Sequence, residues 1–186
     1  MDLNDRFILK SLGDLREIKL APETFDISAA AEKRVGLIAE LAQVQANAPT
    51  DSRLWLGEYV EKKFDLQVLT KKLRLAKPES NCLPWDRMVI GEENMYRVQV
   101  KYCTFIVGRS YFMTVTRSRK HLYRPGDFDF LAVLTPAPEY DDSATEAWYI
   151  IPFHVIAKRY ALTLPCRRTA RKNRVAQFRE RWDLFR

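Results

Sequence analysis

The chain has 186 residues, with 31 Lys and Arg against 24 Asp and Glu, so its formal net charge is +7. This length suits one domain with a core large enough to fold without disulfide or metal staples, and 47% apolar residues argue against disorder. No apolar run reaches the roughly 18–20 residues of a membrane-spanning helix, and we expect no secretory signal. The excess positive charge makes a nucleic acid or an anionic membrane the first partner to test.

The first 50 residues differ in charge from the others. They carry eight acids and six bases, so residues 51–186 hold a net charge of +9. The stretch 28–47 has helical apolar spacing and ends before Pro49. We predict an N-terminal helical arm or partner surface over 1–50 and a main domain over 51–186.

A second helix is predicted from Leu54 to Leu66, with Asp51 or Ser52 as its cap. Leu56, Val60 and Phe64 form its apolar stripe, four residues apart. Beyond it, 67–75 alternates apolar and basic residues and indicates a strand.

The middle of the chain favours strands. Residues 85–90 and 95–104 are predicted to form a β-hairpin around the turn 91–94, because the second segment alternates cleanly. Further strands are predicted at 111–116, 128–134 and 147–153. The mostly apolar 128–134 is expected to be central, and 175–185 is expected to form a short helix.

The cysteines give no metal pattern. Cys82, Cys103 and Cys166 are odd in number and widely spaced, and His121 and His154 complete no zinc motif with them. We expect small buried apolar cysteines in a reduced, cytoplasmic compartment.

Asp86, Gln99 and Lys101 are the candidate chemical constellation. Gln99 and Lys101 lie two apart on one strand and share a face, and Asp86 lies on the paired strand. A carboxylate and an amide oxygen suit Mg²⁺, which activates water and polarises phosphate; a lysine beside them can orient water and stabilise developing charge. The alternative is an ordinary polar outer face of a half-exposed strand.

This pattern resembles the PD-(D/E)XK nuclease superfamily, and within it the family related to group I intron-encoded homing endonucleases, in its Q-x-K variant. The resemblance covers about 52–186, and its segments are LGEYVE (56–61), PWDRMV (84–89), YRVQVK (96–101), YRPGDFDFLA (123–132), WYIIP (148–152) and FRERWDL (178–184).

The resemblance implies an α/β (α+β) fold, with a restriction-endonuclease-like central mixed sheet flanked by helices and an αβββαβ core. It implies Mg²⁺-dependent DNA cleavage, with Mn²⁺ as a possible substitute. Asp86 and Gln99 match the metal-binding positions and Lys101 matches the motif lysine. The helix glutamate is Glu58 or Glu61, and we favour Glu61 because it follows Gly57 by four residues.

Some polar residues have two interpretations. Gln99 is neutral where most of the superfamily has an acid, which leaves open a protein that only binds DNA. Asp127 and Asp129 are extra metal ligands or, as we favour, turn and strand-end residues. We expect Trp148 and Tyr149 in the core, and His154 in a structural role.

Basic residues cluster in three places and are expected to contact DNA phosphates. The predicted DNA-binding residues are Lys71, Lys72, Arg74, Arg117, Arg119, Lys120, Arg167, Arg168, Arg171 and Lys172. Lys77 and Arg174 extend the first and last clusters; solvated charged faces are the alternative.

The sequence therefore predicts a Mg²⁺-dependent endonuclease acting on double-stranded DNA, as a homo-oligomer (dimer or tetramer), without a membrane partner. The alternatives are a catalytically weak DNA-binding or assembly protein with the same fold, and a basic interaction protein whose arm binds another subunit.

Overall fold

The structure is a computed structural model that describes residues 27–46, 53–79, 82–108, 110–118, 121–137, 146–166 and 173–186. The chain divides into two compact units, Met1–Lys33 and Arg34–Arg186. Helix α2 (Ile27–Ala46) coincides with the helix predicted at 28–47. The second unit begins within this helix, and the domain boundary at residue 50 stays a prediction.

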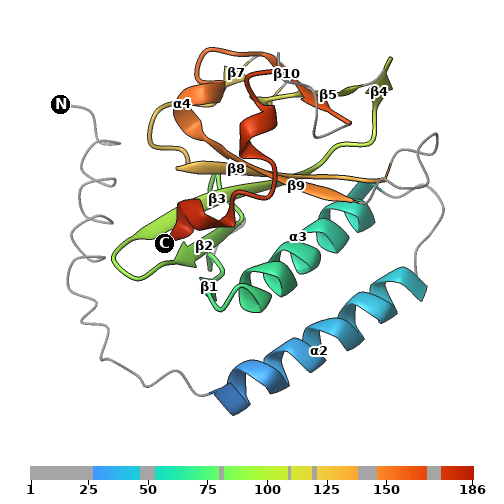
Figure 1. Ribbon diagram of the computed structural model, residues 1–186, viewed down its shortest axis with the longest axis vertical. Helices are drawn as coiled ribbons and strands as arrows, with labels where there is room; N and C mark the ends of the chain where they lie inside the picture. The colour runs from blue at the N-terminus through green and yellow to red at the C-terminus, as the bar shows by residue number, and fades with distance from the viewer. Residues whose placement is uncertain are drawn as a thin grey trace. The chain divides into compact units, whose positions relative to one another are not determined.

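A mixed sheet of five strands forms the centre of the second unit (Figure 1). Its order is β1 (Arg74–Ala76), β2 (Arg87–Ile90), β3 (Met95–Tyr102), β8 (Phe130–Thr135) and β9 (Ala147–Pro152). Strands β3 and β8 run parallel, and all other neighbours are antiparallel. The central position predicted for 128–134 is confirmed, since β8 lies between β3 and β9.

Each face of this sheet has its own apolar core, because side chains alternate along a strand. Ala132 and Leu134 of β8 belong to the core under helix α3 (Arg53–Thr70). Leu131 and Val133 belong to the core on the other face, where a sheet β10 (Ala161–Pro165), β5 (Ser110–Thr114), β4 (Ile106–Val107) and the short helix α4 (Phe153–Ile156) pack. The predicted central mixed sheet flanked by helices is confirmed (Figure 1).

The predicted αβββαβ order is wrong in one respect. The described residues between β3 and β8 contain no helix; they form β4, β5, β6 (Thr116–Ser118) and β7 (His121–Leu122). The reason is the period of the apolar residues: Tyr111 and Met113 are buried while Phe112 and Thr114 are exposed, which is a strand pattern.

Helix α3 continues past Leu66, so the strand predicted over 67–75 is wrong except at its end. Val68 is buried with Val60 and Phe64, which continues the four-residue stripe. The helix closes with the two hydrogen bonds of a Schellman motif, from Leu73 N–H to Val68 C=O and from Lys72 N–H to Leu69 C=O, both 3.1 Å. Lys72 takes the left-handed conformation, φ 61°, that this closure requires.

The C-terminal segment forms two short 3₁₀ turns, η1 (Ala176–Phe178) and η2 (Trp182–Phe185), instead of the predicted helix. Glu180 breaks the segment with φ 55° and donates its backbone N–H to Trp148 C=O at 2.8 Å. Phe185 is fully buried beside the β2–β3 turn, where a Cβ on Gly91 would collide with the Phe185 carbonyl oxygen.

Trp148 and Tyr149 are buried in the two cores, as expected. Cys103 and Cys166 are also buried, but the expectation fails for Cys82, which is exposed. Among the described residues, no helix is both long and apolar enough to cross a membrane.

Candidate active site

The β2–β3 register brings Asp86 to Gln99. Arg87 pairs with Val98, so Asp86, one residue earlier, lies across from Gln99 where β2 begins. The Asp86 carboxylate accepts hydrogen bonds from the Val100 backbone N–H at 2.7 Å and from the Gln99 side-chain amide. Both bonds end on Oδ2. Within the described part of the chain no hydrogen bond reaches Oδ1, so this oxygen is the one available to a further ligand.

Lys101 lies on the same face of β3 as Gln99, opposite the buried Val98 and Val100. Its Nζ is 5.9 Å from the centre of the Tyr123 ring, a cation–π distance. Tyr123 packs edge-on against the buried Phe128, with ring centres 4.8 Å apart. Tyr123 therefore forms a wall of the site. Sequence reasoning assigned Tyr123 no role, because its contact with Lys101 joins β3 to a distant loop.

The structure brings Glu61, and not Glu58, toward Asp86. Glu61 Oε2 lies 3.0 Å from Arg87 Nη1, and its side chain is 34% exposed. Burial raises the pKa of Glu61, and the negative charge of Asp86 adds to this shift. The Glu58 side chain is 60% exposed and lies 3.9 Å from Lys62, one helical turn along α3.

Arg87 connects the site to the protein interior. Only 5% of Arg87 and 1% of Asp65 are exposed, and the guanidinium donates to both Asp65 oxygens, Nε at 2.5 Å and Nη2 at 3.2 Å. Its Nη1 donates to the Asp86 carbonyl oxygen at 2.7 Å. Sequence reasoning missed this pair; the available signal was Asp65, an acid directly beside the apolar stripe of α3.

Burial dominates the electrostatics of the site. It raises the pKa of Asp86 and the pKa of Glu61, and Arg87 opposes the shift in both. Burial also lowers the pKa of Lys101, although Asp86 favours its charged form. Tyr123 has a pKa raised to about 12, first by burial and then by the charge of Asp86. The desolvated carboxylate of Asp86 therefore lies near the desolvated ammonium group of Lys101, a pairing typical of functional sites.

The donor set suits a hard cation. Asp86, Glu61 and the Gln99 amide carbonyl offer oxygen, the ligand type that Mg²⁺ prefers. The described residues contain no group of three Asp, Glu, His or Cys side chains placed to hold a metal, so any metal here would rely on two carboxylates and an amide. A bound cation would favour the charged form of both desolvated acids.

The raised pKa of Asp86 predicts a stability effect of Asp86→Asn. The pKa of Asp86 is higher in the folded protein than in the unfolded chain, so protonation of Asp86 stabilises the folded state. This stabilisation is fully present below the unfolded pKa and is lost as pH rises through the folded pKa. We expect Asp86→Asn to be more stable than the wild type at about pH 8, with a smaller gain toward about pH 4. Urea unfolding at both pH values measures this; a gain that grows toward acid pH would contradict it.

The other predicted residues lie as follows. Lys71, Lys72 and Arg74 are exposed around the α3–β1 turn, and Arg117 is exposed on β6. Asp127 accepts a hydrogen bond from the Arg124 N–H at 2.8 Å, and Asp129 pairs with Arg97 at 3.0 Å, as turn and strand-end residues do. His154 is exposed on α4. The predicted DNA-binding residues that lie outside the described residues are Arg119, Lys120, Arg167, Arg168, Arg171 and Lys172.

The fold is similar to that of a bacterial homing endonuclease, I-Ssp6803I, with a TM-score of 0.59 and 24% sequence identity. The match covers 72% of this chain and 93% of that chain. No protein-family model matches the sequence, and no curated protein matches it. At this identity the likeness shows the fold alone, a mixed α and β architecture with a central mixed sheet.

Proposed function

We propose that the chain is a Mg²⁺-dependent endonuclease of the PD-(D/E)XK type, homing-endonuclease-like, that hydrolyses phosphodiester bonds in double-stranded DNA. One observation carries the proposal: Asp86, Gln99 and Lys101 gather at the β2–β3 hairpin beside Glu61 of α3, as partly desolvated groups. The similarity of the fold to that of a homing endonuclease supports it.

Each residue has a role in this proposal. Asp86, Gln99 and Glu61 would hold the cation, Mg²⁺ or Mn²⁺, which supplies phosphate polarisation and a lowered pKa of bound water. Lys101 would orient the attacking water and stabilise charge on the phosphate, and its desolvation strengthens both interactions. The Tyr123 ring would hold the lysine in place. Because each chain carries one such site, cutting both strands favours a dimer or tetramer.

A catalytically weak DNA-binding protein is the second candidate, and a specific observation favours it. Glu61 pairs with Arg87, and Asp86 accepts from Gln99, so the site acids already have partners. Gln99 is neutral, so the site has one negative charge fewer than a site with Asp or Glu at this position.

Cleavage of supercoiled plasmid DNA separates the two candidates. We expect nicked and then linear products with Mg²⁺ and none with EDTA. Plasmid that stays supercoiled with Mg²⁺ and with Mn²⁺, while the protein binds it, would support the second candidate over the first.

The paired variants Glu61→Gln and Glu58→Gln test which helix glutamate acts. Glu61→Gln should slow cleavage by about 10–10²-fold and raise the Mg²⁺ concentration needed for half-maximal rate, because a ligand carboxylate is lost. Glu58→Gln removes the same charge one turn away on the exposed side of α3 and should leave the rate within about twofold. Initial rates across a Mg²⁺ titration measure both; the reverse ranking would reassign the helix carboxylate to Glu58.

A further inference from the structure

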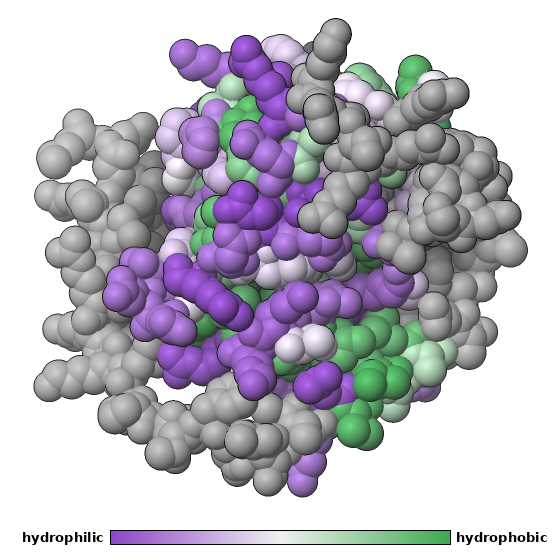
Figure 2. Space-filling view, viewed as in Figure 1, coloured by the Kyte–Doolittle hydropathy of each residue, from purple (hydrophilic) through white to green (hydrophobic). Residues whose placement is uncertain are grey.

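A groove lies beside α4, along β10 and the segment leading into η1. It has a volume of about 1060 Å³ and is open to solvent. Its polar lining includes His154 after β9, Arg159 in the α4–β10 turn, Thr163 of β10 and Arg174 before η1. Val155, Leu162 and Val175 also border the groove; Leu162 and Val175 are buried and form its floor. Figure 2 shows hydrophilic surface over α4 and η1 at the top of the view, with apolar surface between.

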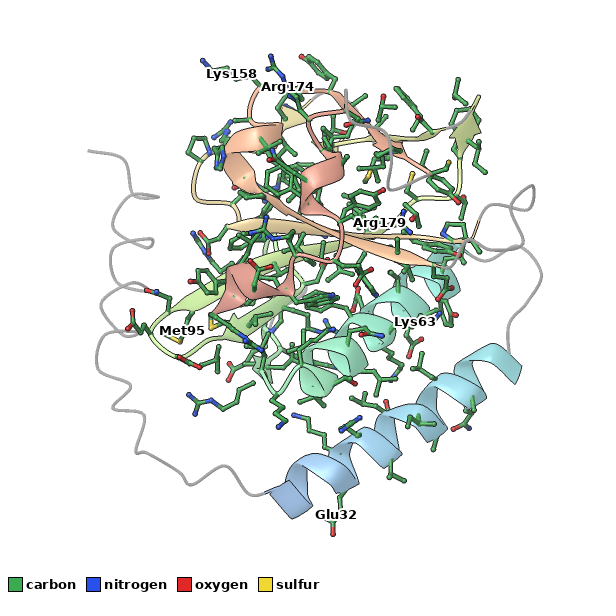
Figure 3. All side chains as sticks on the ribbon, viewed as in Figure 1. Glu32, Lys63, Met95, Lys158, Arg174 and Arg179 are labelled. Carbon is green, nitrogen blue, oxygen red and sulfur yellow. The ribbon has the colours of Figure 1, made fainter. Side chains whose placement is uncertain are left out.

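The groove is positively charged. Among the residues that the structure describes, no acidic side chain lines it. Arg159 and Arg174 are both exposed, and within the described part of the chain neither forms a salt bridge with a carboxylate. Lys158 adds a third cation at the rim and adopts a left-handed φ of 64°. In Figure 3, Lys158 and Arg174 both point outward from the ribbon at the top of the view.

The chemistry of the groove suits an extended polyanion. Guanidinium groups bind phosphate oxygens in pairs of hydrogen bonds. Pockets for small molecules bury most of their ligand, whereas this groove is wide and open. We propose that it binds backbone phosphates of a DNA strand, outside the candidate active site.

Aromatic packing connects the groove to the candidate active site on one side of the central sheet. Phe153, the first residue of α4, lies 5.4 Å from Phe128, ring centre to ring centre. Phe128 lies 4.8 Å from Tyr123, whose ring centre is 5.9 Å from Lys101 Nζ. The groove and Lys101 therefore lie on the same side of the central sheet. The inference rests on the proposed function and extends it to a flanking DNA contact.

The test compares Arg159→Gln/Arg174→Gln with the wild type in binding a fluorescent random-sequence DNA duplex over a range of KCl concentrations. Losing two phosphate contacts should reduce the slope of log Kobs against log salt by about 2. Arg159→Lys/Arg174→Lys should keep the slope. The control Lys33→Gln/Arg34→Gln removes the same charge from exposed positions of α2 and should also keep it.

An unchanged slope in Arg159→Gln/Arg174→Gln, with an unchanged melting temperature, would overturn the proposal that the groove binds DNA phosphates. An equal loss in Lys33→Gln/Arg34→Gln would also overturn it, because net charge alone would then explain binding. Plasmid cleavage by the same wild-type preparation tests the proposed function separately. If Arg159→Gln/Arg174→Gln changes the slope as expected but the wild type does not cleave, DNA binding by the groove is supported and the endonuclease activity is not. If the wild type cleaves but the slope is unchanged, the endonuclease activity is supported and DNA binding by the groove is not.

Discussion

Replacing Lys101 by methionine should lower the rate of Mg²⁺-dependent plasmid cleavage by about 10²–10³-fold and leave the protein folded. Arg97 also lies on the face of β3 that carries Gln99, but its guanidinium pairs with Asp129. It is therefore not free to replace the ammonium group of Lys101 beside Asp86. Methionine keeps the length of the side chain and its packing on Tyr123. Initial cleavage rates at saturating Mg²⁺ measure the effect.

Stability separates a functional lysine from a structural one. Burial lowers the pKa of Lys101, so the charged ammonium group destabilises the folded state relative to the unfolded chain. This destabilisation is present at neutral pH and disappears once the pH rises above the unfolded pKa. The Lys101→Met variant should therefore unfold at an equal or higher urea concentration than the wild type at neutral pH. Lys33→Met, at an exposed position of α2, should cleave like the wild type. Full cleavage by Lys101→Met would remove Lys101 from the proposed mechanism.

The local part of the site was predictable from the sequence. Alternation along 95–104 places Gln99 and Lys101 on one face, and the short turn 91–94 fixes which residues of the hairpin face each other. The hydrogen bond between Gln99 and Asp86 follows from that register. Helical periodicity could not choose between Glu58 and Glu61, because residues three apart lie on nearly the same helix face. The choice depends on Arg87, a residue of another element.

The non-local part was not predictable. Tyr123 reaches Lys101 only because the β6–β7 hairpin and the turn after it fold back onto β3. Asp65 meets Arg87 only because α3 packs on this part of the sheet. The short strands β4, β7 and β10 lack a long alternating pattern, so their pairing is decided by neighbouring elements and not by their own residues.

Arg87→Met should destabilise the fold more than any other change considered, by about 3–5 kcal/mol. The Asp65 carboxylate is almost fully buried and receives two hydrogen bonds from the guanidinium. Without Arg87, its nearest cation is Lys77, at 3.5 Å on an exposed side chain, which cannot replace the two buried bonds. Urea unfolding at neutral pH measures the loss of unfolding free energy.

Two comparisons identify the cause of that loss. Arg181→Met breaks the exposed pair between Arg181 and Asp183 and should leave the unfolding midpoint unchanged. Arg87→Met/Asp65→Leu removes both charges and should recover most of the stability, since replacing a whole buried pair by apolar side chains is often neutral. This double variant would still lack the contact to Glu61, so it should fold yet cleave more slowly. Recovery of stability together with full cleavage would show that the ion pair supports the fold and not the site.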